Sequence, residues 1–144
     1  MVDDGSSDNT ISIANKFKLQ KKFKFKIIEL SHKGSPARSR NMGIKLSKGK
    51  YIFFLDADDL FFKNKLSYIN KNLLTKNPDV IYHDVEIQHT NKNFIAKKIS
   101  KKNPLKDLLL NGNKIILSSS AIKRKFITKK NIRFNENKKL ISVE

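Results

Sequence analysis

The first third of the chain alternates short apolar segments with amphipathic ones. After an apolar dipeptide at the start, residues 25–30 and 51–55 form two further apolar segments, and the second carries no charge. Apolar side chains recur at helical spacing over 10–21 and 37–46, and Pro36 suits the first turn of the second helix. The order strand, helix, strand, helix, strand predicts an α/β fold with a parallel sheet and right-handed crossovers.

The rest of the chain is less regular. Helical spacing recurs over 64–77, where Leu66 and Ile69 are expected to face inward and Pro78 ends the helix. The other predicted elements are strands over 80–89, 94–97 and 114–118, a helix over 104–111 closed by Gly112, and a basic segment over 123–130.

Three carboxylates follow the apolar segment 51–55 within four residues: Asp56, Asp58 and Asp59. The segment predicts a strand buried on both faces, and open α/β sheets bind ligands at the carboxyl ends of their strands. Clustered carboxylates repel one another and suit a hard cation such as Mg²⁺ or Mn²⁺. The alternative is a solvated turn in which Asp58 or Asp59 caps the following helix, and the residues alone do not separate the two.

A second acidic loop, residues 3–8, follows the apolar start of the chain. Its composition suits a tight turn and a cap for the next helix. For Asp3 and Asp4 this interpretation competes with a hydrogen bond from a ligand's ring N–H, and the residues alone favour the cap. Arg38 and Arg40 fall near the start of the second helix, where they would face phosphates or serve as ordinary surface arginines.

Composition limits the class of protein. The length of 144 residues predicts one domain, and the lack of cysteine excludes disulfides and thiolate metal sites. No apolar segment approaches the ~20 residues of a membrane-spanning helix, and nothing resembles a signal peptide, so we expect a cytoplasmic protein. The three histidines have no metal-ligand spacing.

The net charge of +18 is uneven, with +5 over residues 1–60 and +13 over 61–144. The second half is therefore the better partner for anionic lipid headgroups or a phosphorylated acceptor, although a solvated lysine surface explains the charge as well. Only four of the 31 basic residues are arginine, the residue that reads bases by paired hydrogen bonds, which disfavours nucleic acid.

Three motifs occur in order: Val2–Thr10 (VDDGSSDNT), Ser39–Ile44 (SRNMGI) and Gly49–Asp59 (GKYIFFLDADD). Together they resemble the family-2 glycosyltransferases. The resemblance implies a GT-A fold, Rossmann-like, with a mostly parallel sheet flanked by helices. It implies a single partial domain over 1–144, in which 1–62 binds a nucleotide sugar and 63–144 begins the acceptor side.

The resemblance also implies an activity. It is the inverting transfer of a hexose from a nucleotide sugar, commonly a UDP-sugar, to a saccharide or lipid-linked acceptor. Bacterial surface polysaccharide or lipooligosaccharide synthesis is the implied setting, with Mn²⁺ or Mg²⁺ as cofactor. The implied location is the cytoplasm, with peripheral contact at the inner face of the membrane.

The same resemblance assigns roles to single residues. Asp4 would hydrogen-bond the base of the donor, commonly uracil, and Asp3 would support the loop. Arg40 would lie near the base or the diphosphate. In the DxD-type motif, Asp56 and Asp58 would contact the nucleotide sugar, and Asp58 and Asp59 would hold the metal.

Two departures from the family pattern change the expectation. Family members begin with a strand in the middle of the sheet, and its absence here would leave two neighbouring strands with unpaired N–H and C=O groups. Members also place the general-base Asp in a Glu-Asp pair after a Phe-x-Glu segment. Phe134-Asn135-Glu136 matches that segment, the Asp is missing, and Glu144 is the one substitute. We therefore expect weak binding of a nucleotide diphosphate with Mn²⁺, and slow or absent transfer.

Two other hypotheses remain open. The first is a basic protein that binds nucleic acid or an anionic surface without catalysis, which predicts strong salt dependence and no effect of Asp58. The second is a non-enzymatic remnant that folds only with a partner that supplies the missing strand.

Overall fold

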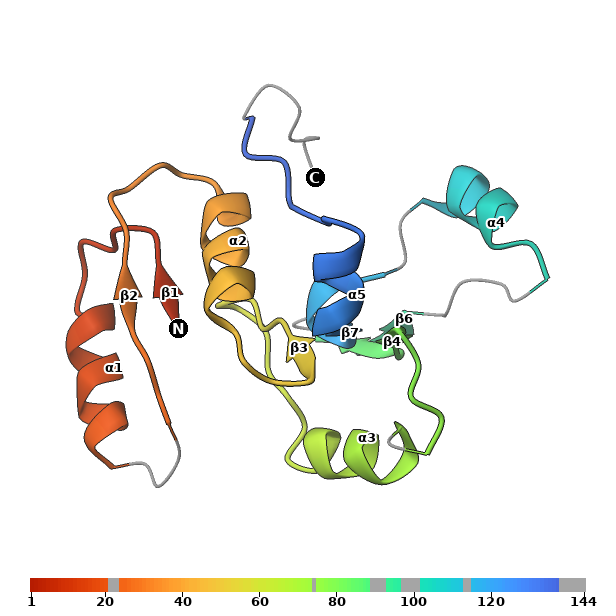
Figure 1. The fold of residues 1–144 in the computed structure, drawn as a ribbon, viewed down its shortest axis with the longest axis horizontal. Helices are drawn as coiled ribbons and strands as arrows, with labels where there is room; N and C mark the ends of the chain where they lie inside the picture. The colour runs from red at the N-terminus through yellow and green to blue at the C-terminus, as the bar shows by residue number, and fades with distance from the viewer. Residues whose placement is uncertain (21–23, 74, 89–92, 97–101, 113–114, 138–144) are drawn as a thin grey trace. The chain divides into compact units, whose positions relative to one another are not determined.

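The computed structural model describes all residues except 21–23, 74, 89–92, 97–101, 113–114 and 138–144 (Figure 1). The chain divides into two compact units, Met1–Lys48 with Lys129–Glu144, and Gly49–Thr128. These boundaries differ from the division into 1–62 and 63–144, which stays a prediction.

The first unit contains β1 (Val2–Asp3), α1 (Thr10–Leu19), β2 (Ile28–Glu29) and α2 (Pro36–Leu46). β1 and β2 pair in parallel, with Val2 opposite Ile28. α1 connects them and buries Ala14, while Phe17 packs edge-on against Phe25 with ring centroids 5.4 Å apart. This strand–helix–strand unit confirms the order of elements predicted for the start of the chain.

α2 begins at Pro36, as the sequence predicts, because proline needs no hydrogen bond for its nitrogen in the first turn. The helix packs against β1, and a Cβ at Gly43 would lie 4.0 Å from a methyl group of Val2. It ends at Leu46, where the N–H of Ser47 donates to the carbonyl of Gly43. α2 therefore carries the Ser39–Ile44 motif along a helix that is anchored to the first strand.

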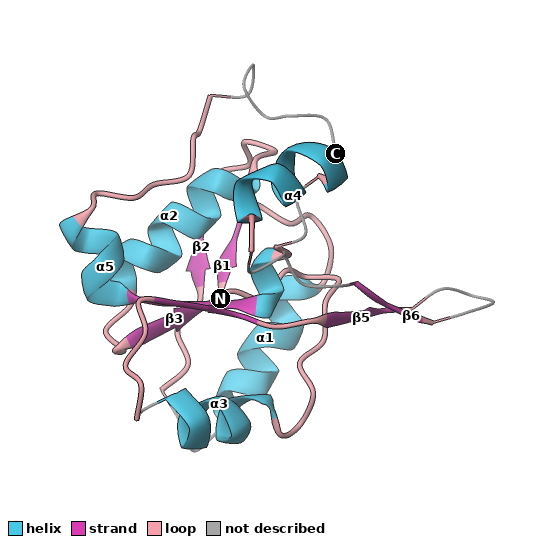
Figure 2. Cartoon of the chain, turned by 90° about the vertical axis from the view of Figure 1, so that its right-hand side faces the viewer, coloured by secondary structure: helices cyan, strands magenta, loops and turns pink. Residues whose placement is uncertain are grey.

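The described residues of the second unit form β3 (Tyr51–Phe53), α3 (Lys65–Leu73), β4 (Val80–Tyr82), β5 (Val85–Ile87), β6 (Phe94–Ala96), α4 (Pro104–Asn111), the 3-10 turn η1 (Leu117–Ser119), β7 (Ser120–Lys123) and α5 (Arg124–Lys129), whose last residue belongs to the first unit. β7 lies between β3 and β4 and is antiparallel to both, with Ala121 opposite Phe53 and Ile81. β5 and β6 form a separate antiparallel pair (Figure 2).

Strand direction differs from the expected mostly parallel sheet. Among the described strands, β1 and β2 pair in parallel, and the other three pairs are antiparallel. The cause lies in β7, which follows η1 directly and enters between β3 and β4 without a crossover helix. β3 and β4 still run in the same direction, since each is antiparallel to β7. The α/β class of the prediction is retained.

The strand predicted over 114–118 is wrong. Leu117–Ser119 forms a 3-10 turn, and the strand begins only at Ser120. The serine hydroxyls explain the difference, because Ser119 Oγ donates to the carbonyl of Ile116 at 2.6 Å and Ser120 Oγ to that of Leu117 at 2.7 Å. Such local bonds compete with a strand ladder.

The single strand predicted over 80–89 is two strands, β4 and β5. They are separated at His83 and Asp84, where the ring Nδ1 of His83 lies 2.6 Å from the carbonyl oxygen of Asp84. The predicted alternation of faces is nevertheless present: Ile81, His83, Val85 and Ile87 are half-buried, and Tyr82, Asp84 and Glu86 are exposed.

The core of the second unit differs from expectation at two points. Ile52 and Phe54 of the apolar segment are buried, but Leu55 is 52% exposed, so the segment is not covered on both faces at its end. In α3, Leu66 is 54% exposed, whereas the neighbouring Lys65 is only 8% exposed. None of the described helices has the length and apolar character needed to cross a bilayer.

Candidate functional site

The predicted site residues fall in both units. Asp3, Asp4 and Arg40 belong to the first unit, and the acidic turn, residues 56–59, belongs to the second.

The buried carboxylate of Asp3 builds the loop after β1. It is 7% exposed and accepts hydrogen bonds from the N–H groups of Gly5 at 2.9 Å and Ser6 at 2.8 Å, and from the Ser6 hydroxyl. The hydroxyl bond from Ser6, with the N–H groups, holds the pKa of Asp3 below its ordinary value, although burial opposes this. All these partners lie within the loop, so Asp3 supports its shape.

Gly5 brings this loop against the loop after β2. Its φ of +79° is a conformation that side chains rarely adopt, and a Cβ there would lie 2.8 Å from the backbone nitrogen of His32. The close approach therefore requires glycine.

Asp4 joins the same two loops through its side chain. Its carboxylate accepts the N–H of Gly34 at 2.7 Å and, more weakly, that of Lys33 at 3.2 and 3.3 Å. Desolvation raises the pKa of Asp4, but N–H donors from Lys33, Gly34 and Ser35 and the nearby His32 ring outweigh it, so the net pKa is lowered. The side chain is 22% exposed, and a carboxylate offers about four acceptor positions, which leaves capacity for a ligand N–H.

His32 forms the other side of this junction. Its Nδ1 lies 2.8 Å from the carbonyl oxygen of Asp4 and 3.8 Å from the Asp4 carboxylate. A carbonyl can only accept, so Nδ1 of His32 carries a hydrogen. His32 is not among the predicted site residues, and its only signal in the sequence is its position in the loop after the second strand.

These loops line an open surface pocket of about 360 Å³, formed by Asp4, Gly5, Ser6, Ser7, Asp8 and His32. Its size lies within the range of small-molecule sites, roughly 300–1,000 Å³. Asp8 bonds the N–H of Thr10 at 2.9 Å at the start of α1. The pocket thus combines two carboxylates, one imidazole and two serines.

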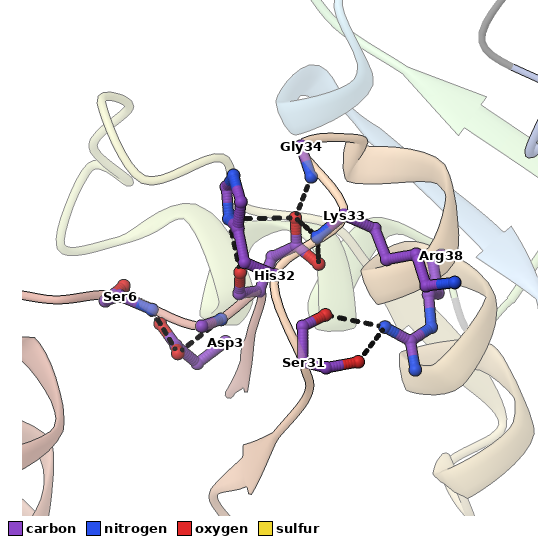
Figure 3. Close-up of polar contacts among 9 residues, drawn as sticks. Asp3, Ser6, Ser31, His32, Lys33, Gly34 and Arg38 are labelled. Carbon is purple, nitrogen blue, oxygen red and sulfur yellow. Dashed lines mark hydrogen bonds and ion pairs between the residues drawn. The ribbon is translucent and has the colours of Figure 1, made fainter.

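The two arginines of α2 have different contacts. Arg38 donates from Nη1 to the carbonyl of Ser31 at 2.8 Å and to its hydroxyl at 3.3 Å, which holds the loop after β2 (Figure 3). The Arg40 guanidinium lies 5.5 Å from the centre of the Phe134 ring. The predicted contact of Arg40 with a base or diphosphate stays a prediction.

The acidic turn begins beyond β3. The N–H of Asp59 donates to the carbonyl of Asp56 at 3.2 Å, and the N–H of Asp56 donates to Ser118 Oγ at 3.0 Å. Asp58 is exposed and Asp59 half-buried. The alternative that Asp58 or Asp59 caps the next helix is wrong, because α3 begins only at Lys65.

Lys65 lies behind this turn. Its Nζ donates to the carbonyl of Ser118 at 2.6 Å and lies 3.6 Å from the centre of the Phe61 ring. Burial lowers the pKa of Lys65, and the charge of Asp59 opposes that shift in part. Ser118 therefore links a buried cation to the backbone of the acidic turn. Helical periodicity gave no sign of it, since lysine is the residue expected to face solvent.

The acids of the turn suit a metal ion that is held partly by substrate phosphates, rather than one enclosed by protein ligands. Among the residues that the structure describes, no three metal-ligating side chains converge. Mg²⁺ is commonly held by one or two carboxylates together with substrate phosphates, and the exposed Asp58 with the half-buried Asp59 suits that arrangement. The candidate base Glu144 lies outside the described residues.

Comparison with known proteins adds to this geometry. The profile described as Glycosyl transferase family 2 matches residues 1–135. Glycosyltransferase GlyG of Streptococcus pneumoniae is 35% identical over 81 residues, which are 56% of this chain and 27% of GlyG. The poly(ribitol-phosphate) beta-N-acetylglucosaminyltransferase TarP of Staphylococcus aureus is 29% identical over 140 residues, which are 93% of this chain and 41% of TarP.

Solved structures show the same fold. The crystal structure of S. aureus TarS 1-349 superposes with a TM-score of 0.75 at 21% identity, and its complex with UDP with a TM-score of 0.72 at 23% identity. Each match covers 94% of this chain and 40% of the TarS chain. The predicted GT-A fold is confirmed. The chain spans less than half the length of GlyG, TarP and the TarS chain.

Proposed function

We propose, from the premise that the chain belongs to glycosyl transferase family 2, that it binds the nucleotide of a UDP-sugar. The whole protein would transfer that sugar to a saccharide or lipid-linked acceptor. The observation that carries this is the pocket beside Asp4, where one carboxylate keeps acceptor capacity at the junction of two loops. The UDP complex of the similarly folded TarS supports uracil as the base.

The Asp4 carboxylate supplies the recognition. The imide N–H of uracil is a donor, and a charged acceptor forms a stronger hydrogen bond with it than a neutral one does. The backbone N–H groups of Lys33 and Gly34 keep the carboxylate ionised and oriented. A base that presents an acceptor at this position would face the carboxylate charge and be rejected.

The acidic turn would serve the diphosphate. In an inverting transfer, the acceptor oxygen bonds to the anomeric carbon as the bond from that carbon to the diphosphate oxygen breaks. UDP leaves with the bonding pair, and the proton of the acceptor hydroxyl passes to a carboxylate base. Mn²⁺ or Mg²⁺ held by Asp58 and Asp59 would neutralise the charge on the leaving group. Glu144 is the candidate base that the sequence offers.

Nucleotide binding tests the proposal most directly. We expect the chain to bind UDP with Mn²⁺ in calorimetry, and Asp4→Asn to weaken binding roughly ten- to hundredfold, because a charged hydrogen bond contributes about 1.5–3 kcal/mol. Asp58→Asn should abolish the gain that Mn²⁺ gives. The exposed acids Glu29 and Asp79 provide matched controls, and Glu29→Gln and Asp79→Asn should bind as the unaltered chain does. Equal binding by Asp4→Asn and the unaltered chain would refute the base site.

A membrane-facing role is a separate part of the proposal. Residues 61–144 carry a net charge of +13, which favours peripheral contact with anionic lipid at the inner face of the membrane. Vesicles with and without anionic lipid, compared in a sedimentation assay, would test it. Equal sedimentation with both kinds of vesicle would refute it.

A further inference from the structure

The side-chain amide of Asn41 binds both backbone groups of Phe134. Its Oδ1 accepts the N–H of Phe134 at 2.9 Å, and its Nδ2 donates to the carbonyl of the same residue at 2.9 Å. The second hydrogen of Nδ2 goes to Glu136 Oε1 at 2.8 Å. Both Nδ2 hydrogens and Oδ1 are therefore engaged, and they connect segments 93 and 95 residues apart in the chain.

The neighbouring residue strengthens this contact. Arg40 lies over the ring of Phe134, so α2 holds both the backbone and the side chain of that residue. α2 begins at Pro36, directly after the loop that binds the Asp4 carboxylate. Asn41 follows five residues later, about 8 Å along the helix axis. A single helix thus connects the pocket loop to the Phe134–Glu136 segment.

Glu136 is fixed at one carboxylate oxygen and open at the other. Oε1 accepts from Asn41, while Oε2 has no hydrogen-bond partner among the residues that the structure describes. The residue is exposed. A carboxylate oriented in this way is a strong acceptor for a hydroxyl group, and hydroxyl groups are the principal donors of a sugar.

We propose that Asn41 is a positioning residue that orients Glu136, and that Glu136 Oε2 accepts a hydrogen bond from a sugar hydroxyl. The inference rests on the proposed function, since the sugar belongs either to the donor or to the acceptor. Asn41 does not touch the sugar in this arrangement. It acts by holding the Glu136 carboxylate in a fixed position against α2.

Amide NMR of the full chain with Mg²⁺ separates the two sources of the sugar. UDP alone should shift the amides of Asp4, Gly5 and His32 and leave those of Phe134 and Glu136 unchanged. UDP-N-acetylglucosamine should also shift Phe134 and Glu136 if the donor sugar is bound. UDP with free N-acetylglucosamine should do so if an acceptor sugar is bound. No shift at Phe134 and Glu136 with either sugar would overturn the inference.

Variants separate positioning from mere stability. Glu136→Gln keeps an oxygen for Asn41 to bind, so hydrogen exchange of the Phe134 amide should stay slow while the affinity for the sugar falls about tenfold. Asn41→Asp turns a carboxylate toward Glu136 and should speed that exchange and lower sugar affinity together. The double variant Asn41→Asp/Glu136→Gln restores a donor–acceptor pair between residues 41 and 136 but not the bond from residue 41 to the Phe134 carbonyl, so it should exchange more slowly than Asn41→Asp and faster than the unaltered chain.

The remaining outcomes are distinct. Lys130→Gln, at an exposed residue four positions before Phe134, should leave sugar affinity within about twofold of the unaltered chain, as most surface substitutions do. Unchanged sugar affinity in Glu136→Gln and Asn41→Asp would overturn the inference while UDP binding, and with it the proposed function, still stands. Absence of UDP binding in the unaltered chain would overturn both.

Discussion

Replacing the buried Lys65 by methionine should destabilise the second unit at neutral pH. Methionine keeps the unbranched stem of the side chain and removes the charged end. That end donates to the Ser118 carbonyl at 2.6 Å and lies 3.6 Å from the centre of the Phe61 ring. The substitution therefore removes two contacts of the ammonium group and leaves the packing of the stem in place.

The size of the effect follows from opposing contributions. A hydrogen bond with a charged donor contributes about 1.5–3 kcal/mol. A desolvated contact of a cation with a ring contributes up to about 2 kcal/mol. The burial that lowers the pKa of Lys65 opposes both, since it disfavours the charged form. Because the lowered pKa means that desolvation offsets the gain from the charge itself, we expect a net loss of about 0.5–1.5 kcal/mol, the contribution of an ordinary hydrogen bond, which for a chain of this length lowers Tm by roughly 2–6 °C.

The pH dependence of stability provides a second measurement. Because the pKa of Lys65 is lower in the folded chain than in the unfolded one, the unfolded chain binds more protons between the two values. The cost of burying the charge is fully present below the folded pKa. This cost disappears as the pH rises from the folded pKa toward the ordinary lysine pKa of about 10.4. The free energy of unfolding of the unaltered chain therefore increases over that pH range. The stability difference between the unaltered chain and Lys65→Met should therefore grow as the pH rises through it.

Urea unfolding at several pH values tests both statements. Lys63→Met is the matched control, because Lys63 is exposed and lies two residues earlier, and its stability should change by no more than about 0.5 kcal/mol. An increase in stability of Lys65→Met at neutral pH would show that the contacts of Nζ do not outweigh its desolvation. A difference that shrinks as the pH rises would contradict the direction of the pKa shift.

Three further substitutions test the loops. The pKa of Asp3 is lowered in the folded chain, so its contribution to the free energy of unfolding is complete above the ordinary aspartate pKa of about 3.9 and is lost as the pH falls below that value. Asp3→Asn should therefore lose less stability than the unaltered chain when both are unfolded at falling pH. An equal loss of stability in both chains would contradict this prediction. Gly5→Ala places a Cβ 2.8 Å from the His32 nitrogen at a φ of +79°, and should cost about 1–3 kcal/mol in urea unfolding and weaken UDP binding. Ser118→Ala removes the acceptor of the Asp56 N–H and should cost about 1–2 kcal/mol, whereas unchanged stability and Mn²⁺-dependent binding would show that the turn holds without it.

The sequence predicted best the elements whose signals are local. The α2 helix starts at Pro36, as expected, because proline both fixes φ and lacks the N–H that a first turn leaves unused. α4 has the predicted bounds, and its N-terminus is capped by Asn103, whose side chain accepts from the N–H of Lys106 at 3.0 Å. The motif loops were also found from sequence, since glycines and acids at fixed positions mark them.

The features that the sequence did not predict are those that depend on contacts between residues far apart in the chain. Nothing between Asn113 and Ser120 indicates that the next strand enters antiparallel between β3 and β4, because pairing partners lie far away in the chain. No local pattern predicts the burial of Lys65, because its Nζ donates to the carbonyl of Ser118, 53 residues later. Asn41 lay inside a recognised motif, but its partner Phe134 comes 93 residues later, so its role could not be inferred from spacing.

The distribution of arginine bears on the competing idea of a nucleic-acid binder. Base reading relies mainly on arginine, and three of the four arginines contact protein groups in the structure. Arg38 bonds Ser31, Arg40 lies over Phe134, and Arg124 Nε donates to the Gly49 carbonyl at 3.1 Å. The remaining positive charge is mainly lysine, which neutralises phosphates without reading bases. Charge of that kind explains attraction to an anionic surface but predicts no effect of Asp58, so salt dependence together with Asp58→Asn separates the two functions.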